Sequence, residues 1–414
     1  MIHRGDTMQP LHILVIGTGM YTCGRGTEGY GTIMPAVLEW KRKNRAGEIY
    51  LAGTSPESIH LAQEKIKALQ RIMQVEPAIH YFPEGVQPDP ACYQEAIRRI
   101  PRPACAIIAT PDHLHREMAG AAIEADLHTQ VVKPLAPTLK EVLELIDRQQ
   151  KYKTYCAVDF HKRFDYANLK LKDAISSGLI GDPLYVVVLY SQRKSIPSTQ
   201  FRKWVEKTTV FQYLGIHYID IIYFATQAIP LRVIAVGQKN WLAAQGINTY
   251  DSVQGIIEWQ LPSGKKFNQY ILTNWIDPES TSSLSEQSIK VIGTKGRFES
   301  DQKKRGITVV TDDKGIEEIN PYFTSPYQVD GRVTYRGYGV DSITSFLNDV
   351  IQVEEGAVRI EDLEGKRSTF KQSIVPIAIL EGIDQSLQKN GEWITTPLPT
   401  LSPGRLGHSP GGRA

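Results

Sequence analysis

Two hydrophobic periodicities follow one another along this chain. Over the first 150 residues, short apolar runs of strand length alternate with longer stretches whose apolar residues recur at helical spacing. Strands are expected at 12–17, 48–54, 104–110 and 128–132, and helices at 32–45, 56–73, 112–125 and 138–151. Such alternation predicts a parallel sheet whose strands are joined by right-handed helical crossovers.

The pattern changes after about residue 155, where strand-like runs follow one another with few helices between them. The expected strands are 184–190, 232–238, 252–260, 266–274, 287–292, 296–299 and 307–311. Helices are expected at 168–177, before a turn at 178–183, and at 339–355 and 371–389. Consecutive strands of this kind predict a mostly antiparallel sheet.

Together the two patterns predict the α/β fold class with two domains. Residues 10–155 are expected to form a Rossmann domain with a parallel, doubly wound sheet. Residues 156–396 are expected to form an α+β domain with a large, mostly antiparallel open sheet. Residues 397–414 are rich in Pro, Gly and Ser and are expected to be a disordered tail.

Composition and net charge limit the classes of partner that this chain is expected to bind. A chain of 414 residues exceeds the size of one hydrophobic core, which agrees with two domains. The net charge of +2 gives no general attraction to nucleic acid or to a membrane surface. The first ten residues contain no apolar signal region, and no uninterrupted apolar run reaches membrane-spanning length. The four cysteines form no CxxC pair, so free thiols in the cytoplasm are expected.

A glycine-rich turn follows the first strand. Gly17-Thr18-Gly19 stands where a dinucleotide-binding domain brings pyrophosphate against a helix N-terminus, and these residues and Met20 are expected to contact a cofactor. Thr22 replaces the third glycine of the G-x-G-x-x-G fingerprint. The glycine-rich segment 23–31 then delays the next helix. This segment is either a surface flap or a lid over the cofactor or substrate mouth, with Arg25 near a phosphate.

The second strand ends without a carboxylate. Thr54 and Ser55 occupy the place where an acidic residue usually binds the ribose 2′-hydroxyl of NAD. Because hydroxyl groups do not repel a 2′-phosphate, the expected cofactor is NAD or NADP, with NADP slightly favoured. Thr54 and Ser55 are both expected to contact it.

The strand 104–110 also ends at a ligand-binding edge, since open parallel sheets bind ligands at the carboxyl ends of their strands. Thr110, Pro111 and His115 are therefore expected to line the cofactor site. His113 and His115 resemble a metal-binding pair, but no third ligand is obvious, so no metal is expected.

Two residues carry candidate acid/base chemistry. Lys133 ends the strand 128–132 just before Pro134, and His217 opens a helix in the second half of the chain. Hydride transfer to or from a carbinol carbon needs a group that handles the hydroxyl proton, and both side chains can do so. The alternatives are that Lys133 is a surface residue before a turn and that His217 is a core histidine.

The chain resembles the Gfo/Idh/MocA oxidoreductase family over about residues 11–395. The resemblance rests on these motifs, in this order: Gly17-Thr18-Gly19, Ala109-Thr110-Pro111 with His115, Lys133-Pro134, Arg163-Phe164-Asp165, residues 215–220 and residues 292–296. It implies an NAD(P)-dependent oxidoreductase acting on a hydroxyl or carbonyl carbon of a sugar, cyclitol or sugar derivative. It also implies a homo-oligomer, a dimer or tetramer, whose contacts are made by the open sheet.

The resemblance also implies roles for individual residues. Lys133 matches the lysine of the family's E-K-P motif and is expected to bind both cofactor and substrate, while His217 matches the catalytic histidine. Arg163, Asp220 and His217 are expected to bind substrate, although Arg163 could instead brace the domain hinge.

Two positions depart from the family pattern. Val132 replaces the Glu of E-K-P, and Tyr213, four residues before His217, stands where many members carry an Asp. Tyr213 is expected to take that catalytic place, although a phenol cannot hold an imidazolium as a carboxylate does. Two other functions therefore stay open on the same fold. One is a non-catalytic regulator that senses a nucleotide or metabolite, and the other is an NAD-assisted glycoside hydrolase.

Overall fold

The computed structural model describes residues 10–43 and 46–399, which form two compact units. The first unit contains the described residues up to 161 together with 323–373, and the second contains 162–322 and 374–399. The tail expected at 397–414 lies, beyond residue 399, outside the described residues, as does the end of the helix expected at 32–45.

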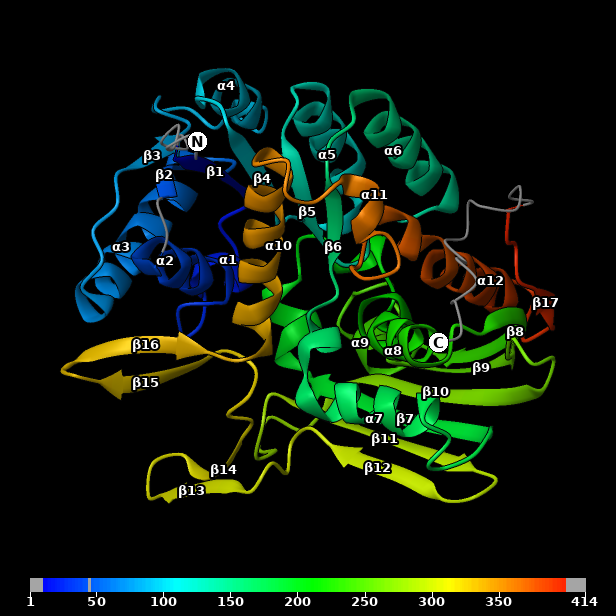
Figure 1. Cartoon of the computed structure of the whole chain (residues 1–414). Helices are drawn as coiled ribbons and strands as arrows, with labels where there is room; N and C mark the ends of the chain where they lie inside the picture. Colours follow the sequence, from blue (N-terminus) through cyan, green and yellow to red (C-terminus); the bar gives the residue numbers. More distant parts are fainter. Residues whose placement is uncertain (1–9, 44–45, 400–414) are drawn as a thin grey trace. The chain divides into compact units, whose positions relative to one another are not determined.

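A six-stranded sheet forms the centre of the first unit (Figure 1). Its strands are β1 (Leu11–Ile16), β2 (Ala46–Ala52), β3 (Ile79–Phe82), β4 (Ala104–Ile108), β5 (His128–Val132) and β6 (Cys156–Asp159). Every neighbouring pair is parallel, and the order is β3-β2-β1-β4-β5-β6. The direction of winding reverses between β1 and β4, which confirms the predicted doubly wound sheet.

Helices connect these strands. They are α1 (Met20–Cys23), α2 (Ile33–Lys43), α3 (Pro56–Met73), α4 (Cys92–Arg99), α5 (His115–Glu124) and α6 (Leu139–Tyr152). Helices α3 and α6 bury one apolar side, as the sequence spacing predicted for α3. Each of these two begins with a capping box, formed by Ser55 with Ser58 and by Thr138 with Glu141.

The sequence pattern missed strand β3 and helix α4, and it did not assign β6 to the first sheet. β3 has four residues and α4 has eight, so neither is long enough for its periodicity to stand out. β6 begins just beyond the domain boundary expected after residue 155, yet it pairs in parallel with β5. Its main-chain hydrogen bonds therefore complete the sheet of the first unit.

The segment 323–373 belongs to the first unit by its contacts, although the expected boundaries assigned it to the second domain. It contains the hairpin β15 (Ser325–Val329) and β16 (Arg332–Arg336), then α10 (Tyr338–Glu354) and α11 (Ile360–Leu363). Helix α10 contacts α2 and β6, and in Figure 1 it runs beside the sheet. Its polar contacts to this unit include Trp40 Nε1 donating to Asn348 Oδ1 at 2.8 Å and His128 Nε2 at 2.8 Å from Glu354 Oε1.

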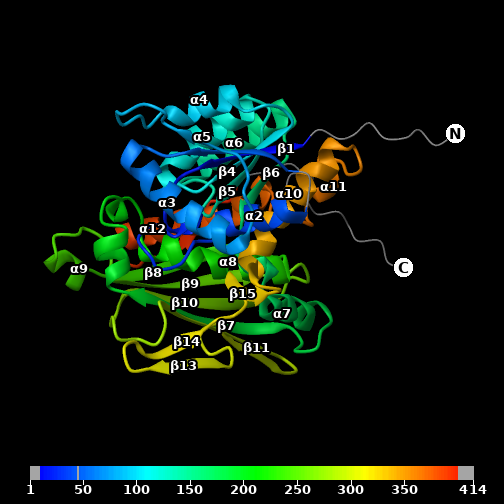
Figure 2. The same ribbon diagram turned by 90° about the vertical axis from the view of Figure 1, so that its left-hand side faces the viewer.

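A seven-stranded sheet forms the second unit (Figure 2). Its strands are β7 (Pro183–Arg193), β8 (Ile229–Gln238), β9 (Ser252–Gln260), β10 (Lys266–Asp277), β11 (Ser285–Gly293), β12 (Arg297–Asp301) and β17 (Ile394–Thr395). The order is β12-β11-β7-β10-β9-β8-β17. Only β7 and β10 pair in parallel in this sheet of described residues, which confirms the mostly antiparallel prediction.

Helices α7 (Tyr166–Ser176), α8 (Ile216–Thr226), α9 (Trp241–Ala244) and α12 (Ile374–Gln388) complete the second unit with the hairpin β13 (Ile307–Thr311) and β14 (Gly315–Ile319). Helices α8 and α12 contact each other, and α12 contacts β8. The outward-facing positions of the sheet include Leu189, Val236 and Leu272, which are 48%, 49% and 40% exposed. Leu189 and Leu272 are register partners on β7 and β10, so they form one apolar patch.

Replacement of Gly17 by Ala is expected to destabilise the first unit. Gly17 has φ +112°, and a Cβ there would lie 2.2 Å from the carbonyl oxygen of Ala109. We expect the free energy of unfolding to fall by about 2 kcal/mol or more, measured by urea denaturation. Gly19→Ala is the matched control, because Gly19 has φ −81° and a Cβ there would meet no atom within 4 Å. Equal denaturation midpoints for the two variants would contradict the close approach at Gly17.

Candidate functional site at the carboxyl edge of the parallel sheet

The loops after β1 and β4 touch at the carboxyl edge of the sheet. Gly17 lies directly against the Ala109 carbonyl, and the Ala109 N–H donates to Ile16 O at 2.8 Å. Gly19, just before α1, leaves open space where a side chain would otherwise stand. A tight turn followed by bare backbone, where the strand order reverses, is the arrangement that lets a dinucleotide pyrophosphate approach. The residues present therefore fit the pyrophosphate of a dinucleotide cofactor.

The end of β2 is polar and carries no carboxylate. Thr54 is exposed, while Ser55 caps α3 by accepting the Ser58 N–H at 3.2 Å. A Cβ on Gly53 would lie 3.0 Å from the Thr18 methyl group, so the ends of β1 and β2 are in contact. Thr18 Oγ1 accepts a hydrogen bond from Arg25 Nη1 at 3.2 Å, which brings a guanidinium to this corner.

The glycine-rich segment 23–31 is hydrogen-bonded to Lys65 of α3. Lys65 Nζ donates to the carbonyl oxygens of Thr27 and Gly29 at 2.6 and 3.0 Å, and it lies 5.4 Å from the centre of the Tyr30 ring. Several hydrogen bonds from one ammonium hold the turn in place. The segment therefore packs against α3 in this structure, and its role as a lid stays a prediction.

His115 bridges two loops. It is buried, and its Nδ1 and Nε2 lie 2.8 Å from the carbonyl oxygens of Pro134 and Thr110 respectively. Burial lowers the pKa of His115, although the nearby Asp112 and the two carbonyls act in the other direction. Both ring nitrogens face backbone, so the side chain acts by holding Thr110-Pro111 and Lys133-Pro134 together. The expectation that His115 itself contacts the cofactor stays a prediction.

Lys133 follows β5 directly and lies at this edge. Burial lowers its pKa to about 7, while the carboxylates of Asp112 and Asp159 raise it and so oppose part of the loss. A lysine with this pKa is partly neutral at neutral pH, whereas an ordinary lysine is almost fully protonated. The Lys133 residue is half-buried, which argues against a fully solvated surface lysine, and its catalytic role stays a prediction.

Asp112 and Asp159 are two acidic residues near Lys133 that the sequence pattern does not single out. Asp112 is 6% exposed, and Asp159 is 1% exposed at the end of β6. A usable signal was present, since Asp159 is a lone carboxylate that ends an apolar run, and parallel sheets place such residues at the ligand edge.

His217 belongs to the second unit, where it is buried in the first turn of α8. Its ring centre lies 6.0 Å from that of Tyr190 on β7. Lys162 Nζ lies 5.5 Å from the Tyr190 ring and 5.3 Å from the Tyr218 ring, and it donates to Gln287 Oε1 at 2.5 Å. The sequence analysis had not singled out this buried cation.

Tyr213 lies in an aromatic cluster. Its ring centre is 4.9 Å from Phe201, 5.9 Å from Trp275 and 6.1 Å from Trp204. Tyr213 and Trp204 are partly exposed. A catalytic role for Tyr213 stays a prediction, whereas the observed ring contacts give it a packing role on the turn that precedes His217.

Arg163 and Asp220 are each other's partners. Arg163 Nε and Nη2 donate to the two carboxylate oxygens of Asp220 at 2.9 and 2.5 Å, and both residues are buried. This bidentate pair joins the chain before α7 to helix α8. It supports a bracing role within the second unit, and the expectation that these side chains bind substrate stays untested.

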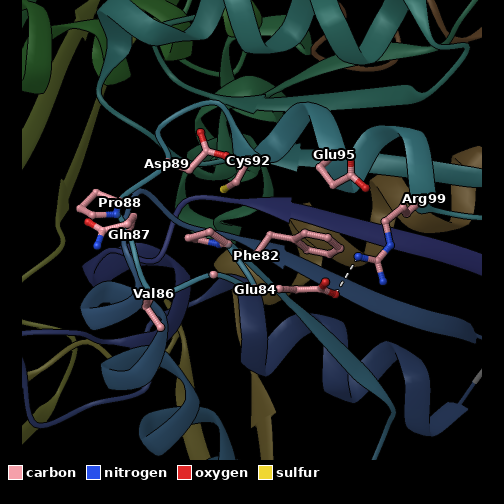
Figure 3. A pocket seen from close by; sticks show the side chains of 11 residues that line it. Phe82, Glu84, Val86, Gln87, Pro88, Asp89, Cys92, Glu95 and Arg99 are labelled. Atoms are coloured by element: carbon pink, nitrogen blue, oxygen red, sulfur yellow. Dashed lines mark ion pairs between the residues drawn. The ribbon is translucent and has the colours of Figure 1, made fainter.

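A surface hollow lies at the carboxyl end of β3 (Figure 3). Phe82, the loop after it and Arg99 of α4 line the hollow, and Arg99 Nη1 lies 2.7 Å from Glu84 Oε1. The loop joins the end of β2 through the Asp89 N–H, which donates to Thr54 O at 3.1 Å. The hollow contains neither Lys133 nor the glycine turn, so we assign no chemistry to it.

Residues 10–43 and 46–399 offer no metal site. No group of three or more His, Cys, Asp or Glu side chains in these ranges could hold a metal ion. All four cysteines are buried and free. Within the same ranges, no helix combines the length and the apolar character needed to cross a membrane.

Two family models match the chain. The model described as "Oxidoreductase family, NAD-binding Rossmann fold" matches residues 11–160. The model described as "GFO/IDH/MocA C-terminal domain" matches residues 168–299.

Curated relatives are distant and only partly covered. The chain is 25% identical over 191 residues to the 1,5-anhydro-D-fructose reductase of Ensifer adhaerens, which spans 46% of this chain and 54% of the reductase. It is 25% identical over 264 residues to the myo-inositol 2-dehydrogenase of Thermotoga maritima, which spans 63% of this chain and 74% of that enzyme.

Solved structures share the whole fold. An inositol dehydrogenase homologue from Azotobacter vinelandii, complexed with NADH and myo-inositol, superposes with a TM-score of 0.69 at 16% identity, covering 94% of this chain and 98% of that one. The scyllo-inositol dehydrogenase of Lactobacillus casei with bound NAD(H) and scyllo-inositol gives 0.64 at 15% identity, covering 94% and 99%. With both domain models matched in order and the fold shared throughout, the chain belongs to the GFO/IDH/MocA oxidoreductase family.

Proposed function

We propose that this protein is an NAD(P)-dependent oxidoreductase that acts on a hydroxyl or carbonyl carbon of a sugar, a cyclitol or a sugar derivative. The observation that carries the proposal is the position of Lys133, half-buried and directly after β5 at the carboxyl edge of the Rossmann sheet, where burial lowers the pKa of its amine to about 7. A protein that only senses a nucleotide has no use for such a group. The relatives that act on anhydrofructose and myo-inositol support the substrate class.

The chemistry assigns Lys133 to proton transfer. When bound, a nicotinamide cofactor accepts the hydride of oxidation or supplies that of reduction. During oxidation the neutral Lys133 amine accepts the proton of the substrate hydroxyl, and during reduction the ammonium returns it. His217 of the second unit is the second acid/base candidate, because a buried imidazole can hydrogen-bond the same kind of hydroxyl.

Replacement of Lys133 by Met should abolish turnover without abolishing cofactor binding. We expect kcat for sugar or cyclitol oxidation to fall by about 10²–10⁴-fold, the usual contribution of a general base. NADH and NADPH fluorescence titrations should give dissociation constants close to wild type. Lys140→Met, an exposed lysine on α6, is the matched control and should behave as wild type in both assays. Full turnover by Lys133→Met would show that another group is the base. A wild-type protein that binds cofactor without any turnover would favour the non-catalytic regulator instead.

The pH profile follows from the lowered pKa of Lys133. Oxidation needs the neutral amine, so kcat/KM should rise with pH and level off above about pH 7. Reduction needs the ammonium form, so its kcat/KM should fall through the same pH range. Profiles measured from pH 5 to 9 in both directions check this, and a flat profile in both would remove Lys133 from the chemistry.

We further propose that the site accepts NADP, with Arg25 as the cation for its 2′-phosphate. The end of β2 has no carboxylate, and Thr18, which accepts the Arg25 hydrogen bond, lies against Gly53 at that end. A guanidinium suits a phosphate because its N–H groups can bond two oxygens at once. The related inositol dehydrogenase structures contain NADH or NAD(H), so the nucleotide preference is a discriminating test.

Arg25→Ala should weaken NADPH binding selectively. Loss of a charge-assisted hydrogen bond is expected to raise the dissociation constant of NADPH about tenfold, while that of NADH changes by less than about threefold. Lys67→Ala, an exposed cation on α3, controls for the loss of one positive charge. An equal loss for both nucleotides would place Arg25 on their shared pyrophosphate instead, and stronger binding of NADH by wild type would contradict the NADP preference.

We also propose a homo-oligomer held by the outer face of the seven-stranded sheet. Leu189, Val236 and Leu272 expose apolar surface there, and contiguous apolar patches on soluble proteins commonly mark interfaces.

The double change Leu189→Lys and Leu272→Lys should reduce the mass measured by light scattering from a dimer or tetramer to a monomer. Leu179→Lys, 72% exposed in the turn before β7, should leave the mass unchanged. A monomeric wild type would overturn this proposal.

A further inference from the structure

A buried carboxylate at the end of β6 contacts three other polar side chains. Asp159 accepts hydrogen bonds from Tyr21 Oη at 2.6 Å and from Ser342 Oγ at 2.5 Å. His161 Nδ1 lies 3.7 Å from Asp159 Oδ2 and 3.3 Å from Tyr21 Oη. We call Tyr21, Asp159, His161 and Ser342 the Asp159 cluster.

The cluster is assembled from segments that are far apart in sequence. Tyr21 comes from α1, Asp159 from β6 and Ser342 from α10, all within the first unit. The His161 ring is held by three aromatic neighbours. Their ring centres are 5.9 Å away for Tyr21, 5.8 Å for Tyr338 and 5.3 Å for Phe323. An ionised carboxylate that is only 1% exposed costs free energy unless it is fully hydrogen-bonded, and these side chains supply the bonds.

The cluster keeps Asp159 ionised. Burial alone raises the pKa of this carboxyl group, but contacts from His161, Ser342 and Tyr21 outweigh burial and hold the pKa below its usual value. A negative charge therefore stays at the carboxyl edge of the sheet throughout the neutral pH range.

Asp159 is also adjacent to the proposed base. In the parallel pairing of β5 with β6, Val132 is the register partner of Asp159, and Lys133 is the next residue. Two carboxylates act on the Lys133 amine, Asp112 from the turn before α5 and Asp159 from β6, and both raise the Lys133 pKa against desolvation. His161 and Tyr21 act on Asp159, and His113 Nδ1 lies 4.0 Å from Asp112 Oδ1.

We propose that Asp159 is the carboxylate that positions the Lys133 amine for proton transfer, with Tyr21, His161 and Ser342 fixing its orientation. Val132, which stands beside Lys133, can offer no such group. Asp159 is a positioning residue, because it acts through Lys133 rather than on the substrate. This inference rests on the proposed function of Lys133 as the acid/base group.

Asp159→Asn tests the proposal, since it removes the charge and keeps the shape. We expect the acid limb of the kcat/KM profile for oxidation to move to lower pH by about one unit, because a nearby anion stabilises the ammonium. The rate at which Lys133 reacts with acetic anhydride, followed by mass spectrometry as a function of pH, should shift in the same direction. Asp341→Asn, an exposed neighbour of Ser342 on α10, is the matched control and should change neither readout.

The turnover and acetylation readouts distinguish a failure of the proposed function from a failure of the positioning role of Asp159. A wild-type protein that shows no turnover while Asp159→Asn still shifts the acetylation profile contradicts the proposed function but keeps the positioning role. An acetylation profile that is the same in wild type and Asp159→Asn overturns the positioning role. If Asp159→Asn fails to fold, the double change Tyr21→Phe and Ser342→Ala keeps the carboxylate and loosens it. It should lower kcat about tenfold with KM steady, and an unchanged kcat would overturn the proposal.

Discussion

Desolvation of the Lys133 amine is the interaction on which the candidate site depends. An amine whose pKa is about 7 is about half neutral at physiological pH, whereas a solvated lysine, with a pKa near 10.4, is almost entirely protonated. The parallel sheet produces this environment, since β5 carries the chain to the ligand edge, and the loops held by His115 keep Pro134 in place beside it. The cost of burying the amine is offset in part by two carboxylates, which keep its pKa from falling further.

The first unit needs residues from both ends of the chain to build that edge. The glycine turn and Tyr21 come from the first thirty residues, while Ser342 and two aromatic neighbours of His161, Phe323 and Tyr338, come from the segment 323–373. The same segment bonds to β6 through main chain, since the Val158 N–H donates to Ser368 O at 2.7 Å. The Asp159 cluster therefore depends on helix α10, which follows most of the second unit in the sequence.

The fold could be predicted because the burial of each strand or helix determines the spacing of apolar residues along its sequence. Strands such as β4, buried at every residue, read as continuous apolar runs, and α3 and α6 show helical spacing with capping residues. The β6 strand and the segment 323–373 could not be assigned in this way, because their place depends on pairing across long sequence separations. The same limit applies to the site. Lys133 could be found from its motif, but the partners of Asp159 lie 138 and 183 residues away along the chain. The pairing of Arg163 with Asp220 could not be predicted either, because the two residues lie 57 positions apart along the chain.

The most direct test of the central claim is the titration of Lys133 itself. In protein whose lysines carry ¹³C-labelled dimethyl groups, the Lys133 resonance can be assigned by its loss in Lys133→Arg, and its chemical shift can be followed from pH 5 to 11. We expect this resonance to titrate near pH 7, well apart from those of the exposed lysines. A Lys133 resonance that titrates near pH 10 with the others would show a solvated ammonium, and the role of Lys133 as the acid/base group would fail.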